Sequence, residues 1–155
     1  MPASQGPYLS YALLCEKVLR EADGVVSFIR AVDHVTVTVP LAVSVGDETA
    51  PAATAATPSV ALTLAIGLKS GNYVGSAQVK VRIEPPSGST WPEFDTSLRF
   101  EGQDQGAGII LPIQFPVQDE GLYWFSVEVS GEILTRVPLR VTRLSVRQTI
   151  PPQQG

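Results

Sequence analysis

Short stretches in which hydrophobic and polar residues alternate recur along the whole chain, separated by turn-forming dipeptides and prolines. A period of two is typical of β-strands, because successive side chains point to opposite faces of a sheet. The strands expected from this pattern cover residues 8–16, 25–32, 34–39, 60–68, 76–83, 97–101, 109–117, 122–129 and 133–141. The helix-forming run 16–22 is too short for an independent helix. The pattern therefore predicts an all-β fold.

The clearest pattern lies between residues 119 and 141. Two alternating runs flank Ser130-Gly131, which predicts a hairpin with a tight turn. Asp119, Gly121 and Tyr123 stand at the mouth of its first strand, in the spacing of the tyrosine corner of immunoglobulin-type domains, where the phenol binds upstream backbone. We therefore expect an immunoglobulin-like antiparallel β-sandwich of about 7–9 strands.

The alternation also assigns the two faces of this hairpin. Tyr123 and every second residue up to Val129 are expected in the core, and Leu122 and Trp124 on the opposite face. An exposed tryptophan with aliphatic neighbours is typical of interfaces. Alternatively, the 87–96 loop with Trp91 covers Trp124.

The second strand of the hairpin adds three residues to this face. Arg136, Pro138 and Arg140 alternate with inward positions and so point outward. Pro138 has no N–H for a ladder, so its strand is expected at a sheet edge, or with the proline nitrogen facing away from a neighbour. The predicted interface comprises Leu122, Trp124, Pro138, Arg136 and Arg140.

A second face with an unusual composition belongs to the strand 60–68. Ala61, Thr63, Ala65 and Gly67 alternate with large aliphatic residues. This row of small side chains permits close approach of a second layer or of a second molecule.

The length of 155 residues suits one domain, because a chain of this size buries roughly 70% of its unfolded surface. We expect a mobile lead-in at residues 1–7, a single sandwich domain at 8–147 and a tail at 148–155. Within the domain, residues 46–58 are rich in Ala, Thr and Pro and offer little bulky apolar surface, so we expect a flexible loop there.

Candidate chemistry is sparse. Cys15 and His34 are the only cysteine and the only histidine, so thiol catalysis would have to use this pair. We interpret Cys15 as a small core residue and His34 as a solvated turn residue. Zinc-ligand spacing, EF-hand loops, phosphate loops and nucleophile elbows do not occur. We therefore expect no catalytic, cofactor-binding or metal-binding residues, although two convergent carboxylates of a glycosidase remain open.

Charge and targeting signals bound the partners and the location. The net charge of −4 names no partner class. Arg136, Arg140, Arg143 and Arg147 follow the last acid, either as a docking stripe for an acidic partner or nucleic acid, or as charges that protect an edge strand. We favour protection, so a nucleic-acid partner is not expected. The single cysteine, and the lack of a leader pattern or a long apolar run, predict a cytoplasmic protein without membrane contact.

Several of these motifs together resemble an uncharacterised family of small bacterial cytosolic proteins. The shared features are the run YALLCEKVLREADGVVSFI at 11–29, Gly121-x-Tyr123-x-Phe125 and Pro138-Leu139-x-Val141. The resemblance implies an immunoglobulin-like β-sandwich and brings no assigned activity or site residue. The Ala/Thr-rich loop and the Trp91 segment depart from the family.

The sequence thus predicts a noncatalytic protein-interaction or assembly module that binds another protein or itself as a homo-oligomer. The alternative is a carbohydrate-binding or other ligand-binding, possibly hydrolytic, β-sandwich that uses Trp91, Trp124 and Tyr73 as a stacking platform.

Overall fold

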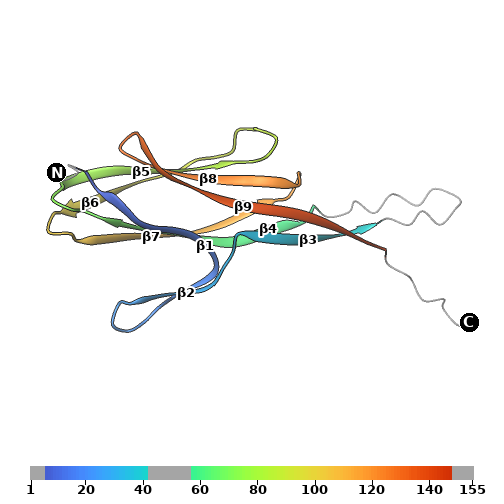
Figure 1. Ribbon diagram of the computed structural model, residues 1–155, viewed down its shortest axis with the longest axis horizontal. Helices are drawn as coiled ribbons and strands as arrows, with labels where there is room; N and C mark the ends of the chain where they lie inside the picture. Colours follow the sequence, from blue (N-terminus) through green and yellow to red (C-terminus); the bar gives the residue numbers. More distant parts are fainter. Residues whose placement is uncertain (1–5, 42–56, 148–155) are drawn as a thin grey trace, which may run out of the picture.

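The computed structural model describes residues 6–41 and 57–147, which form two packed β-sheets (Figure 1). Sheet A has the strand order β2-β1-β4-β7, and sheet B has the order β3-β9-β8-β5-β6. The strands within these two ranges are β1 (Tyr8–Arg20), β2 (Val26–Ala31), β3 (His34–Leu41), β4 (Ser59–Lys69), β5 (Val74–Glu84), β6 (Phe94–Glu101), β7 (Gly106–Pro116), β8 (Gly121–Val129) and β9 (Glu132–Arg147).

The expected all-β sandwich is confirmed, with antiparallel pairing of the described strands everywhere except between β3 and β9, and each predicted strand has a counterpart. The late hairpin forms as β8 and β9, with Ser130 and Gly131 at φ 49° and 88° in its turn. These positive values at both central positions are those of a hairpin turn that matches the right-handed strand twist. The expected lead-in, loop 46–58 and tail lie largely or wholly outside the described residues.

Two strands are longer than the sequence predicts. β1 continues past the predicted end at residue 16 to Arg20, because residues 17–20 pair with β2. β9 continues to Arg147, because its last eight residues pair in parallel with β3. Strand pairing, which a local pattern does not report, thus sets both ends.

The core lies between the inner faces of the two sheets. Tyr123, Phe125, Val127 and Val129 are buried, as their alternation predicts. They face the aliphatic row of β4, whose buried members are Val60, Leu62, Leu64, Ile66 and Leu68.

The tyrosine corner is present. The Tyr123 hydroxyl donates to the Asp119 carbonyl oxygen at 3.0 Å. Gly121 has φ 134°, in the region that favours glycine, and a Cβ there would come within 3.1 Å of the Pro86 ring. The glycine is therefore required both by backbone conformation and by space.

A two-stranded arm, residues Glu16–Ala31, separates from β4 at Cys15. Cys15 is the last β1 residue that pairs with β4 and the first that pairs with β2. At the base of the arm Arg30 has φ 54° and forms an ion pair with Glu16 at 3.3 Å. Figure 1 shows the arm curling away from the sandwich and back below sheet A.

One end of the row of small residues on β4, at Ala65 and Gly67, is covered by the chain itself, whereas Ala61 at the other end is exposed. Tyr11 lies across Gly67, and its ring packs edge-on against Phe28 of the arm, with the ring centroids 5.1 Å apart. Ala65 beside it is buried. The described elements include no helix long and apolar enough to cross a membrane.

Candidate interaction surface

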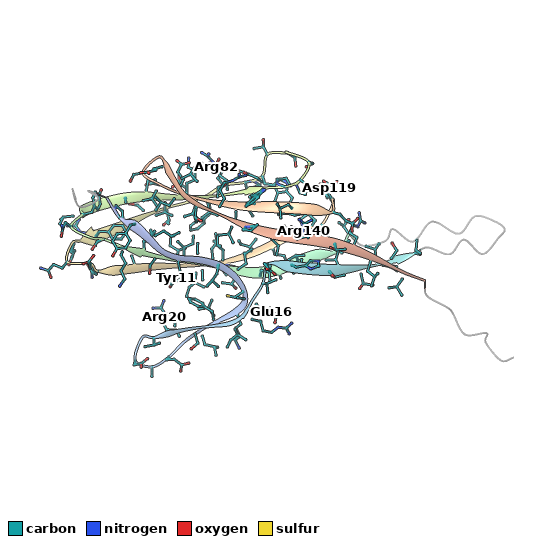
Figure 2. All side chains as sticks on the ribbon, in the orientation of Figure 1. Tyr11, Glu16, Arg20, Arg82, Asp119 and Arg140 are labelled. Carbon is teal, nitrogen blue, oxygen red and sulfur yellow. The ribbon has the colours of Figure 1, made fainter. Side chains whose placement is uncertain are left out.

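The five residues of the predicted interface lie together on the outer face of sheet B. The β8–β9 register places Trp124 opposite Pro138 and Leu122 opposite Arg140. Arg136 is two residues from Pro138 on the same face of β9. Figure 2 labels Arg140 on this strand. We call this group of Leu122, Trp124, Arg136, Pro138 and Arg140 the Trp124 face.

The Trp124 side chain is partly exposed, and Arg136 holds it in place. The Arg136 guanidinium carbon lies 4.6 Å from the centre of the indole ring, a cation–π contact. Arg136 in turn forms an ion pair with Glu84 of β5. Glu84 also accepts a hydrogen bond from the Ser126 hydroxyl at 3.0 Å. The indole is therefore fixed by a chain of contacts that crosses three strands.

The carboxylate of Glu84 is the ionisable centre of this chain. Its hydrogen bond to Arg136 lowers its pKa from the ordinary value, and the Ser126 hydroxyl acts in the same direction. These two contacts thus favour the ionised form of the Glu84 carboxyl group. The alternation of residues 76–83 places Glu84 outward, but only the strand order β5-β8-β9 brings it to Arg136.

A second charge cluster borders the Trp124 face on β5. Arg82 pairs with Glu93 at 2.6 Å and with Glu128 at 3.4 Å, and Lys80 pairs with Glu93 at 3.5 Å. Positive and negative groups compensate one another here. The uncompensated and apolar part of the surface lies toward Leu122, Pro138 and Arg140.

The structure shows how the sheet accommodates Pro138. The edge-strand interpretation is wrong for the second half of β9, because β3 pairs with Arg140–Arg147. The Arg140 amide donates to the Asp33 carbonyl oxygen, so amides two residues apart, including position 138, face the β3 side. The nitrogen of Pro138 therefore faces away from β8, at a point that β3 has not yet reached.

The C-terminal arginines do not form one continuous stripe. Arg136 is engaged by Glu84, and the Arg143 side chain donates to the Gln118 carbonyl oxygen at 3.2 Å. Arg140 is exposed and forms no ion pair with any described residue. It is the cation of this surface that is available to a partner.

The proposed three-ring stacking platform is not assembled. Trp91 packs against Phe115 and Tyr123, with ring centroids 5.5 and 5.9 Å apart. Tyr73 packs on Phe100 at the opposite end of β5, and its hydroxyl donates to Ser76. Trp91 therefore closes one end of the core and does not cover Trp124 from the 87–96 loop.

Cys15 and His34 behave as structural residues. Cys15 is buried, its thiol donates to the Thr63 carbonyl oxygen at 3.7 Å, and burial raises its pKa. His34 is exposed, and its Nε2 lies 2.9 Å from the Thr142 hydroxyl. Neither contact forms a nucleophile–base pair. In the described ranges, no group of three or more His, Cys, Asp or Glu residues could hold a metal ion.

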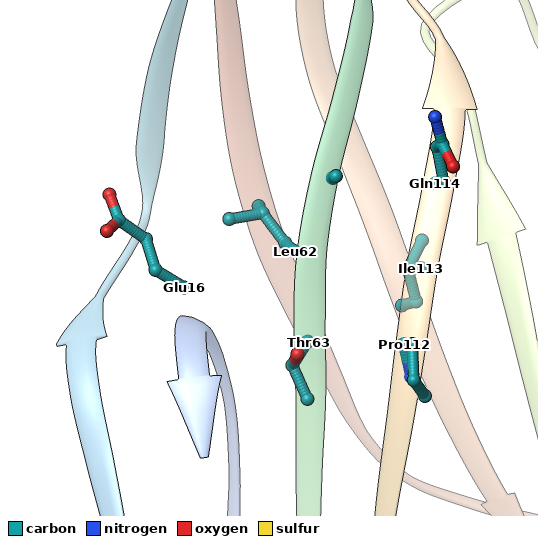
Figure 3. A pocket seen from close by; sticks show the side chains of 7 residues that line it. Glu16, Leu62, Thr63, Pro112, Ile113 and Gln114 are labelled. Atoms are coloured by element: carbon teal, nitrogen blue, oxygen red, sulfur yellow. The ribbon is translucent and has the colours of Figure 1, made fainter.

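A pocket of about 420 Å³ lies on the outer side of sheet A, where β1 turns away from β4 (Figure 3). Glu16 stands on one side, Thr63 lies on β4, and Pro112 and Gln114 lie on β7. Glu16 is its single ionisable lining residue and is paired with Arg30. The pocket therefore presents no converging acid and base.

Comparison with known proteins identifies a family for this chain but no activity. The family model of DUF6941, a family of unknown function, matches residues 10–142. No curated protein matches the sequence.

Two solved structures resemble the chain at 10% identity. One is an immunoglobulin-like protein from Pseudomonas aeruginosa, with a TM-score of 0.37, covering 89% of this chain and 98% of that one. The other is the Pseudomonas fluorescens alkylpurine DNA glycosylase AlkC bound to DNA containing an abasic site analog, with a TM-score of 0.43 and 90% of this chain covered. This chain spans 31% of the glycosylase.

Proposed function

Since the chain belongs to DUF6941, a family of unknown function, we propose a role from its geometry: a noncatalytic module that binds another protein through the Trp124 face. The observation that carries this proposal is the partly exposed indole of Trp124 held under Arg136. Tryptophan and arginine are enriched among the residues that dominate binding energy at protein interfaces.

Preorganisation strengthens this argument. A side chain that is already held in one conformation loses less entropy on binding than a free one. Arg136 is held by Glu84, and Glu84 by Ser126, before any partner arrives. Pro138 adds a rigid apolar ring opposite Trp124. The surface therefore offers a fixed apolar centre with a charged border, which is the usual anatomy of an interface.

Arg140 gives the proposed partner a chemical character. It lies opposite Leu122, is exposed, and has no acid paired with it in the described part of the chain. A partner that places a carboxylate against Arg140 and an apolar side chain against Trp124 would complement the surface. We propose a cytoplasmic, bacterial setting for this binding, in keeping with the single, buried cysteine.

Affinity capture with matched variants tests the proposal. The wild-type chain, Trp124→Ala, Arg140→Ala and the control Val74→Ala are used as baits in lysate of the source organism, and bound proteins are quantified by mass spectrometry. Val74 is 68% exposed and lies outside the Trp124 face. We expect a protein that binds wild type and Val74→Ala but is depleted at least tenfold from both face variants. Equal recovery by all four baits would contradict the proposal.

Light scattering after size exclusion tests whether this face binds a second copy. A homo-oligomer of the wild-type chain that becomes monomeric in Trp124→Ala would identify the partner as the chain itself. Circular dichroism on the same samples confirms that the variants remain folded. An oligomer that ignores Trp124→Ala would place self-association elsewhere on the molecule.

A further inference from the structure

The arm presents a strand edge without a neighbour. β2 is the terminal strand of sheet A and pairs with β1 alone. In Figure 2 the arm lies below the sandwich, with Glu16 at its base and Arg20 further toward its tip. The backbone groups along the outer side of β2 are therefore available to another strand.

The first part of this edge lacks the charges and prolines that the other outer strands carry. β6 carries Asp95, Arg99 and Glu101, and β7 carries Pro112 and Pro116. β3 carries Pro40. Charges and prolines on edge strands prevent sheets from pairing with one another. The first four residues of β2, Val26–Ile29, have neither. Over these four residues the β2 edge can accept a partner strand.

The arm also exposes apolar side chains near this edge. Val25 is 58% exposed, Ile29 40% and Leu19 38%. A two-stranded hairpin is at best marginally stable in water without further packing. Its contact with the sandwich includes the Tyr11–Phe28 ring pair on one face. The opposite face carries Leu19 and Ile29, and a strand added along β2 would extend this apolar face across both molecules.

The charges of the arm are self-complementary. At its tip the acids Glu21 and Asp23 outnumber Arg20, and at its base the cations Lys17 and Arg30 outnumber Glu16, which pairs with Arg30. Two arms that run antiparallel place each acidic tip beside the basic base of the other. Opposite charges brought together in this way favour the antiparallel over the parallel arrangement.

We propose that a second copy of the chain pairs with β2 along this edge, antiparallel and about a two-fold axis near Ser27. Side chains alternate between the two faces of a strand. The faces of two paired copies of β2 therefore coincide only when the residue numbers in each opposed pair differ by an even number. An axis at Ser27 places Val26 opposite Phe28, and Val25 opposite Ile29, of the second copy. The result is one continuous sheet in which β7-β4-β1-β2 of one molecule is followed by β2-β1-β4-β7 of the second.

The contact is small. Six residues of β2 bury much less surface than the roughly 1,200–2,000 Å² of a stable interface. The dimer therefore forms reversibly and increases with protein concentration. It uses sheet A and does not depend on the Trp124 face.

Disulfide trapping at the proposed axis is the most direct test. Opposed residues in an antiparallel pair have Cα atoms about 4.5–5.5 Å apart, which a disulfide can span. Ser27→Cys is compared with Ser97→Cys, an exposed position on the edge strand β6. Cys15 is buried, so it does not compete. Under mild oxidation we expect Ser27→Cys to form disulfide-linked dimers at least tenfold faster. Equal rates, or no dimer from either variant, would overturn the proposal.

Analytical ultracentrifugation over a concentration series gives a second readout. Ile29→Lys adds a guarding charge to the edge, and Val74→Lys makes the same change at an exposed site away from the arm. We expect at least a tenfold lower association constant for Ile29→Lys, with Val74→Lys and Trp124→Ala like wild type. A monomer at every concentration, or a dimer indifferent to Ile29→Lys, would refute pairing through β2. A dimer lost in Trp124→Ala alone would assign self-association to the Trp124 face instead.

Discussion

Tyr11 lies across Gly67 so closely that a Cβ at position 67 would overlap the phenol ring. The ring also approaches Gly108 on β7, where an added Cβ would come within 3.9 Å of the hydroxyl. Because Tyr11 packs on Phe28, this glycine allows the arm to rest on sheet A. Gly67, one member of the row of small residues on β4, thus serves the packing of the chain on itself.

Gly67→Ala should therefore lower the free energy of unfolding by about 1–3 kcal/mol, the usual cost of overpacking. Gly106→Ala on the neighbouring strand is the control, because its Cβ would meet its nearest atom, Lys69 Nζ, at 3.6 Å. Urea denaturation measures both. In a Tyr11→Ala background the same Gly67→Ala change should be close to neutral. An equal cost in both backgrounds would show that the ring is not what excludes a side chain.

The tyrosine corner provides a second prediction. Tyr123→Phe removes the hydrogen bond to Asp119 and leaves the buried ring in place, so we expect a loss of about 1 kcal/mol. For a domain of this size that corresponds to a fall in Tm of about 2–4 °C. Tyr73→Phe, which removes a more exposed bond to Ser76, should cost less in the same calorimetric experiment. A larger loss from Tyr73→Phe would contradict this ranking.

The parts of the fold that follow from local rules could be predicted from the sequence. Alternation fixed the inward row at Tyr123 and Phe125, and turn chemistry fixed the hairpin at Ser130-Gly131. The tyrosine corner is also local, since its two partners are four residues apart. In each case the residues that determine the structure lie close together in the sequence.

The rest depends on contacts between distant segments. Residues 16–20 have a helix-forming composition, and become strand because β2 pairs with them. Trp91 lies in a loop, and only the meeting of β7 and β8 places Phe115 and Tyr123 beside it. The link from Glu84 to Arg136 likewise requires the strand order β5-β8-β9. The alternation of hydrophobic and polar residues does not report these contacts between distant segments.

The reactivity of Cys15 provides a third prediction. The thiolate is the reactive form, and burial both raises the pKa of this thiol and shields it from reagents. Iodoacetamide should therefore modify the native chain far more slowly than the chain unfolded in urea. The exposed thiol of Ser97→Cys should react quickly in the native state. Rapid modification of Cys15 under native conditions would reveal that the start of the arm opens readily.

The ion pair between Arg136 and Glu84 makes the stability of the fold depend on pH. Arg136 holds the pKa of Glu84 below its value of about 4.5 in an unfolded chain. A carboxyl with a lowered folded pKa stabilises the fold fully above the unfolded pKa, and this stabilisation is lost as pH falls through the folded pKa. The group is partly exposed, so solvent and salt screen the effect and its size is modest.

Comparison of wild type with Glu84→Gln by urea denaturation across pH isolates this contribution. The difference in unfolding free energy should be constant near neutral pH, begin to shrink below about pH 4.5, and vanish at lower pH. In an Arg136→Gln background the dependence should be weaker, because the partner that lowers the pKa is gone. A difference that grows as pH falls would mean that Glu84 is bound more favourably in its protonated form. That result would also remove the fixed carboxylate on which the orientation of Arg136 over Trp124 depends.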